Sequence, residues 1–146
     1  MVERRKIAIA KQCDAVLVVP EEDIAAFEDA VSAFETILKK EHHFTDPDLH
    51  IYVEKKEYGE YEALDKETAQ KLMALLIHLP NGVQKRIPEF PDSVQTSLNM
   101  GTLGQAEDEI SMTFSVRSSV TSEKEWLMSQ MEHLTKAFGG YCRISG

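Results

Sequence analysis

The sequence predicts an α+β fold of the ferredoxin-like kind, an antiparallel sheet with helices packed on one face. Three observations support this prediction. Two runs near residues 94–117 alternate strictly between apolar and polar side chains. Several segments carry apolar residues at helical spacing. The order strand, helix, strand is weakly repeated, at about 15–54 and at about 94–146. At 146 residues and 42% hydrophobic content, we expect a single domain, 1–146.

The first copy of the repeat consists of two predicted strands and one helix. Residues 14–19 are mostly apolar and β-branched, which is typical of a strand buried on both faces, and Pro20 ends the run. Residues 49–53 alternate, which predicts a half-buried strand. Between them, apolar side chains recur at steps of three and four and predict a helix: Ile24, Phe27, Val31, Phe34 and Leu38.

The middle of the chain predicts a second helix followed by an irregular segment. Asp65 is the expected N-cap, and the helix runs to Leu79, where Pro80 and the turn dipeptide Asn81-Gly82 stop it. Because Pro88 and Pro91 follow closely, we expect no regular structure before residue 94.

The second copy of the repeat is a predicted hairpin followed by a helix. Residues 94–100 and 110–117 form the two strands, and the glycines between them indicate a turn over 101–108. Ser122 and Glu125 fit a capping box that opens a helix. Gly139 ends this helix, and residues 141–144 are expected to form a last short strand.

The predicted hairpin collects polar side chains on one face. Arg117 is the one guanidinium in this set, and its planar fork of donors suits a carboxylate. A binding face and an ordinary solvated sheet face both fit this pattern. The set consists of Gln95, Ser97, Asn99, Ser111, Thr113, Ser115 and Arg117.

Composition and motifs exclude several function classes. With 16 basic and 25 acidic residues the net charge is −9, which argues against a nucleic-acid partner. No apolar run is long enough for a membrane span and no signal peptide is recognisable, so a cytoplasmic protein without membrane contact is expected. The histidines and cysteines lack zinc-site spacing, and Cys13 and Cys142 are expected to be reduced and partly buried. We therefore predict no catalytic residue and no metal ligand in this chain.

Three segments resemble consecutive motifs of the bacterial aminoacyl-histidine dipeptidases, in the order in which they occur in that family. The segments are Leu79-Pro80-Asn81-Gly82-Val83, then residues 94–101 (VQTSLNMG), then residues 117–122 (RSSVTS). The resemblance extends over roughly residues 8–146. Residues 8–11 resemble a further family segment, although Ile7 stands where that family has asparagine.

The resemblance implies that this chain corresponds to a lid and dimerisation domain. These dipeptidases belong to a clan of co-catalytic zinc peptidases, and their metal ligands and general base lie outside the part that matches here. Zinc would therefore belong to a parent enzyme that hydrolyses Xaa-His dipeptides, and this chain would hold no cofactor. The expected partners are the catalytic domain, the dipeptide and a second copy of the chain. Arg117 would bind the substrate carboxylate, and Asn99 is a second candidate substrate-binding residue.

A second class of function fits the same residues. The chain would then be a free-standing ferredoxin-like module whose polar sheet face binds a small molecule or another protein. Neither interpretation makes the isolated chain an enzyme; only the first makes it part of one.

Overall fold

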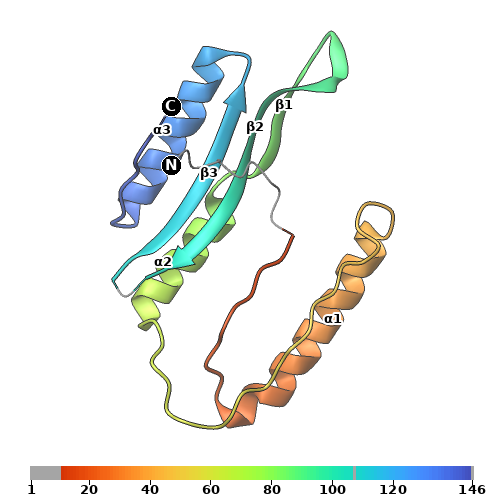
Figure 1. Ribbon diagram of the computed structural model, residues 1–146, viewed down its shortest axis with the longest axis vertical. Helices are drawn as coiled ribbons and strands as arrows, with labels where there is room; N and C mark the ends of the chain where they lie inside the picture. The colour runs from red at the N-terminus through yellow and green to blue at the C-terminus, as the bar shows by residue number, and fades with distance from the viewer. Residues whose placement is uncertain (1–10, 107, 146) are drawn as a thin grey trace, which may run out of the picture. The chain divides into compact units, whose positions relative to one another are not determined.

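The computed structural model describes residues 11–106 and 108–145. Contacts divide the chain into two compact units, one made of Met1–Asp14 with Leu64–Gly146 and the other of Ala15–Ala63. The second unit holds the 3-10 helix η1 (Glu21–Asp23) and the helix α1 (Ile24–His42) (Figure 1). The first unit holds α2 (Lys66–His78), β1 (Gly82–Ile87), β2 (Phe90–Gln105), β3 (Ile110–Ser118) and α3 (Thr121–Ala137).

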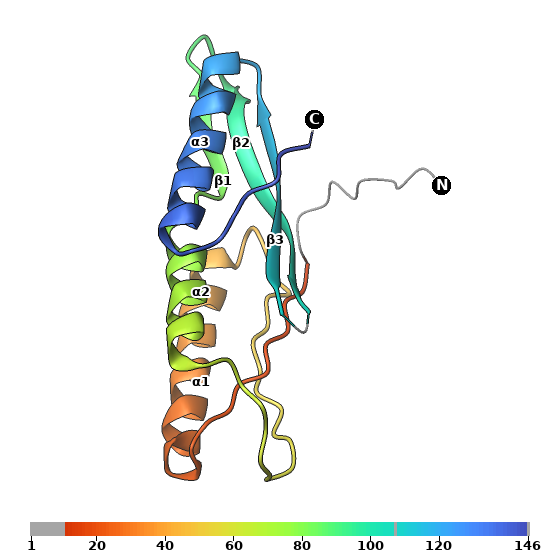
Figure 2. The ribbon, with the colours of Figure 1, turned by 90° about the vertical axis from the view of Figure 1, so that its left-hand side faces the viewer.

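The described strands form one antiparallel sheet in the order β1-β2-β3. Helices α2 and α3 lie on the same face of this sheet (Figure 2). The most buried side chains belong to that side: Leu98 of β2 is 2% exposed and Leu127 of α3 is 5% exposed. The predicted α+β class, with an antiparallel sheet and helices on one face, is confirmed.

Strand β2 is longer than predicted and contains a bulge. It continues to Gln105, so Gly101 and Gly104 lie in the strand and not in a turn. Met100 pairs with Phe114 and Thr102 with Thr113, which leaves Gly101 as the extra residue. The bulge reverses the alternation along β2, so Leu103, opposite Met112, stays on the apolar face of the sheet.

The segment expected to be irregular forms the edge strand β1. Its register with β2 shifts three times, between Val83/Lys85, Lys85/Arg86 and Arg86/Ile87. The prolines are compatible with this strand because Pro88 lies after its end and Pro91 lies at the start of β2. Repeated register shifts explain why the pattern of residues 82–87 did not look like a regular strand.

The caps of the helices follow the sequence at two of three predicted sites. Asp65 caps α2: its Oδ1 accepts hydrogen bonds from the backbone N–H groups of Glu67 (2.9 Å) and Thr68 (3.0 Å). Gly139, at φ +82°, ends the last helix as expected. The predicted capping box is wrong, because α3 begins at Thr121 with Val120 at its N-cap and no side-chain cap.

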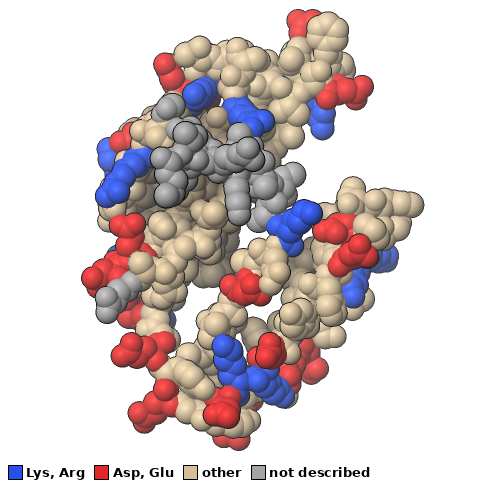
Figure 3. Space-filling model, viewed as in Figure 1, with Lys and Arg blue, Asp and Glu red and all other residues tan. Residues whose placement is uncertain are grey.

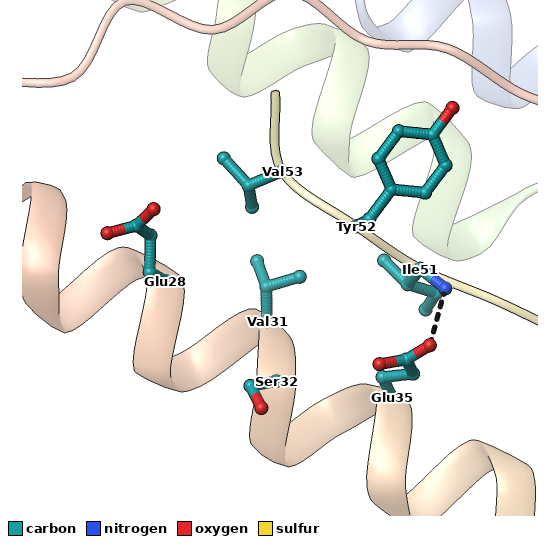
Figure 4. A pocket seen from close by; sticks show the side chains of 7 residues that line it. All are labelled: Glu28, Val31, Ser32, Glu35, Ile51, Tyr52 and Val53. Atoms are coloured by element: carbon teal, nitrogen blue, oxygen red, sulfur yellow. Dashed lines mark hydrogen bonds between the residues drawn. The ribbon is translucent and has the colours of Figure 1, made fainter. Parts of the chain in front are cut away.

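In the second unit, two carboxylates of α1 bind the extended segment 50–55. Glu35 accepts a hydrogen bond from the backbone N–H of Ile51 (3.1 Å), pairs with Lys39 (2.9 Å) and contacts His50. Glu28 pairs with Lys55 at 2.9 Å. Figure 4 shows the shallow pocket between the helix and this segment. We call these contacts the α1 clamp.

The α1 clamp also sets the charge state of its central carboxyl group. The bonds from Lys39, then from the Ile51 N–H, then from His50 lower the pKa of Glu35 to about 2 from its ordinary 4.5. Glu35 is therefore held as a carboxylate over the whole neutral range.

Three predicted strands are absent from the described structure. Residues 14–19, 49–53 and 141–144 are not assigned to any ladder, so the strand–helix–strand repeat is not formed by paired strands. Residues 16–18 are 56–76% exposed, not buried on both faces. Residues 49–53 contact α1 in place of another strand, and Tyr141 donates a hydrogen bond to Glu109 at 2.6 Å. A strand needs a backbone partner, and here side-chain contacts replace one.

Candidate functional site: the polar face of the sheet

The register of β2 and β3 places the predicted polar side chains on one face. Ser97 is directly opposite Arg117, and Asn99 is opposite Ser115. Opposed residues of an antiparallel pair project from the same side of the sheet. Leu98 and Val116, which lie between these pairs, project toward the helices. The predicted polar face is therefore present, and in this unit helices α2 and α3 cover the opposite side (Figure 2).

Arg117 is the penultimate residue of β3 and is exposed. Its position at a strand end allows the side chain to reach past the ladder. Asn99 is half-buried and lies one pair further along the same face, so its Cα is about 7 Å along the strand from that of Ser97. The structure thus places the two candidate substrate-binding residues on the same face of neighbouring strands. Their role in binding a substrate stays a prediction.

One backbone hydrogen bond shows which residue pairs are hydrogen-bonded at this end of the sheet. The N–H of Ser119 donates to the carbonyl of Gln95 at 3.0 Å. Because hydrogen-bonded and non-bonded pairs alternate, Arg117 and Ser97 form the next hydrogen-bonded pair. The backbone of Arg117 is therefore paired with that of Ser97 in β2.

The family-like motifs meet at this end of the sheet. Asn81 Oδ1 accepts a hydrogen bond from the backbone N–H of Met100 at 3.0 Å, which ties the start of β1 to β2. Gly82 follows with φ +82°, a conformation that favours glycine, and pairs with Leu98. Segments far apart in the sequence are thus adjacent in space.

One neighbour of the site was missed from the sequence. Val83 pairs with Ser97, so Val83, Ser97 and Arg117 form a row across the three strands. Val83 is 49% exposed and adds an apolar side chain to the polar face. Residues 82–87 (GVQKRI) gave no alternating signal for this neighbour, because the charged Lys85 stands between Val83 and Ile87.

The remaining chemistry of the described residues is limited. Within residues 11–106 and 108–145, no group of three histidine, cysteine or acidic side chains is placed to hold a metal ion. Cys13 and Cys142 are free but exposed, not partly buried as expected. No described helix has the length and apolar character to cross a membrane. Ile7 and residues 8–10 lie outside the described residues.

Charges are mixed on the surface drawn in Figure 3. Among the described residues visible there, lysine and arginine side chains are interspersed with acidic ones and form no broad basic patch. The expectation that nucleic acid is not a partner stays a prediction.

Two dipeptidases are similar to this chain. The cytosol non-specific dipeptidase of Escherichia coli (strain K12) is 24% identical over 139 residues, which are 95% of this chain and 28% of that protein. The crystal structure of aminoacylhistidine dipeptidase from Vibrio alginolyticus matches with a TM-score of 0.81 and 21% identity, over 88% of this chain and 26% of that one. The chain therefore spans little more than a quarter of either relative. No protein-family model matches it.

The fold and the site define an α+β domain with helices on one face of its sheet and polar side chains on the other. By sequence and by fold, this domain is related to part of a dipeptidase.

Proposed function

We propose that the chain acts as the lid and dimerisation domain of a zinc dipeptidase that hydrolyses Xaa-His dipeptides. In this role Arg117 binds the free carboxylate of the dipeptide and Asn99 contacts the substrate beside it. The observation that carries the proposal is the placement of Arg117 at the end of β3, exposed and opposite Ser97, in a domain related to dipeptidases. A guanidinium can bind both oxygens of a carboxylate at once.

The proposed lid would supply binding and closure, and the chemistry would take place elsewhere in the parent enzyme. The described residues do not fit a metal site, so no metal-dependent step is assigned to this chain. When the lid closes, it excludes water and positions the dipeptide relative to the catalytic domain. The proposed setting is cytoplasmic.

A chimeric enzyme tests the proposal. This chain replaces the matching segment of the E. coli cytosol non-specific dipeptidase, and kcat/KM is measured for dipeptides with a free and with an amidated C-terminus. We expect Arg117→Ala to lower kcat/KM for the free acid by about 30- to 1000-fold, or about 2–4 kcal/mol, because a charged partner is left unpaired. Arg117→Lys should restore only part of the loss, since the charge stays but the fork is lost.

Arg86 provides the matched control. It is an exposed arginine of β1 whose guanidinium bonds the carbonyl of Pro91 at 3.1 Å. Arg86→Ala should leave the preference for the free acid unchanged. If Arg117→Ala slows both substrates by the same factor, Arg117 is not the carboxylate-binding residue. A chimera that folds but does not hydrolyse either substrate favours the free-standing binding module.

A further inference from the structure

Next to Arg117, on the helix-covered side of the sheet, the buried hydroxyl of Thr96 is paired with the half-buried hydroxyl of Ser118. Thr96 is 1% exposed, and its Oγ1 lies 2.8 Å from Oγ of Ser118. The same Oγ of Ser118 donates to the carbonyl of Val120 at 2.9 Å and accepts from the Val120 N–H at 3.1 Å. Ser118 has one hydroxyl proton, and the carbonyl takes it. Thr96 must therefore be the donor of the bond between the two hydroxyl groups.

The pair occupies a specific place in the ladder. Thr96 and Ser118 form the non-hydrogen-bonded pair next to Ser97 and Arg117, where opposed side chains approach most closely. They project to the helix-covered side, while Arg117 projects to the polar face. Strand ends open more easily than strand centres, and Arg117 lies one residue from the end of β3. The position of Arg117 therefore depends on the contacts that hold the end of β3 on β2.

The Ser118 hydroxyl also binds the backbone of Val120, the residue that precedes α3. Helix α3 has no side-chain cap at Val120, and the hydroxyl of Ser118 binds both backbone groups of that residue. One hydroxyl thus joins the end of β3 to the start of α3, and Thr96 joins both to β2. Valine has the branched shape of threonine but no hydroxyl, so Thr96→Val removes the donor to Ser118.

We propose that Thr96 and Ser118 are positioning residues, which hold the end of β3 so that Arg117 presents its guanidinium to a substrate carboxylate. This inference rests on the carboxylate-binding role proposed for Arg117. The hydroxyl pair acts through the backbone on either side of Arg117 and does not itself contact the substrate.

The first test is amide hydrogen exchange in the isolated chain. Arg117 and Ser115 are both in hydrogen-bonded pairs with β2, so Ser115 reports on the sheet and Arg117 on its end. We expect Thr96→Val and Ser118→Ala to speed exchange at Arg117 by about tenfold relative to Ser115, the size of one lost hydrogen bond. Thr113→Val, an exposed threonine of β3, is the control and should leave this ratio unchanged.

If the exchange rates of the Arg117 and Ser115 amides rise by the same factor, the Thr96–Ser118 hydrogen bond contributes only to overall stability. That outcome overturns the inference. Thr96→Ser decides the matter if the other two variants unfold, because it keeps the donor and removes only a methyl group. It should retain the wild-type ratio, and loss of the ratio in this variant overturns the inference.

The second test uses the chimera and separates this inference from the proposed function. Thr96→Val should reduce the preference for the free acid over the amidated dipeptide by about tenfold, and Thr96→Ser should restore that preference. If Arg117→Ala does not change the preference, the carboxylate role itself is wrong. If Arg117→Ala abolishes the preference while Thr96→Val leaves it intact, only the positioning role is wrong.

Discussion

Lys85 Nζ lies 2.6 Å from Glu123 Oε1, which joins the edge strand β1 to the first turn of α3. The side chains are 49% and 32% exposed, so solvent screens the pair. The contact joins two elements that are far apart in the sequence, the edge strand β1 and the helix α3. Together with the Ser118 hydroxyl, it anchors the start of α3, which has no side-chain cap.

For this ion pair we expect a small, salt-dependent effect. Glu123→Gln should lower the free energy of unfolding by about 0.5 kcal/mol, and the loss should shrink at high salt. A double-mutant cycle with Lys85→Met, followed by urea unfolding, measures the coupling. The pair of Glu67 and Lys71 within α2 is the matched control, since it joins no separate elements. A coupling that does not respond to salt contradicts this account.

Asn81 is exposed but should contribute more to stability than most exposed side chains, because its Oδ1 accepts the hydrogen bond from the Met100 N–H. Removing its Oδ1 leaves the Met100 N–H without that acceptor, so Asn81→Ala should cost about 1 kcal/mol and speed exchange of the Met100 amide. Asn81→Asp keeps an acceptor oxygen and should preserve most of the protection. The contact has no role at this site if the Met100 amide exchanges at the same rate in the alanine variant.

The α1 clamp should weaken in acid. The pKa of Glu35 is lowered in the folded state, so the carboxylate contributes stability that is fully present above pH 4.5 and is lost as the pH falls toward about 2. The carboxyl carbon signal of Glu35 should titrate near pH 2, and the Ile51 amide should shift with it. In Glu35→Gln the Ile51 shift should disappear, whereas Glu22→Gln in η1 should leave it in place. A Glu35 midpoint near 4.5 would contradict the clamp.

The isolated chain should form a weak homodimer at high concentration. In the described sheet, the outer edge of β3 carries no further strand, and such edges tend to pair. The alternation of hydrogen bonds directs the N–H groups of Phe114 and Val116 away from β2. Sedimentation equilibrium should detect the dimer, and exchange at these two amides should slow as concentration rises. A monomer at millimolar concentration is the contrary result.

The purified chain should neither bind catalytic zinc nor cleave a dipeptide. The reason is the absence of a metal-ligand group in the described ranges 11–106 and 108–145. Zinc content by elemental analysis and hydrolysis of Xaa-His dipeptides are the measurements. Stoichiometric zinc accompanied by hydrolysis would falsify this expectation.

The sequence by itself determined the features that depend on local periodicity and local chemistry. The stripe of α1, the Asp65 cap of α2 and the Gly139 stop of α3 follow from interactions within a few residues of each other. The two alternating runs likewise predicted the polar face with Arg117, because successive strand side chains must point to opposite sides.

Only the tertiary structure decided which extended segments became strands and which residues became neighbours. Residues 14–19 and 49–53 have strand-like patterns but no ladder, whereas residues 82–87 pair with β2 despite the nearby prolines. Ser97 faces Arg117 because of a register that no local pattern specifies, and the Ser118 hydroxyl binds the backbone of Val120 because the strand end lies next to the start of α3. A helix satisfies its backbone within its own segment, but a strand must find a partner, so pairing and register are properties of the whole fold.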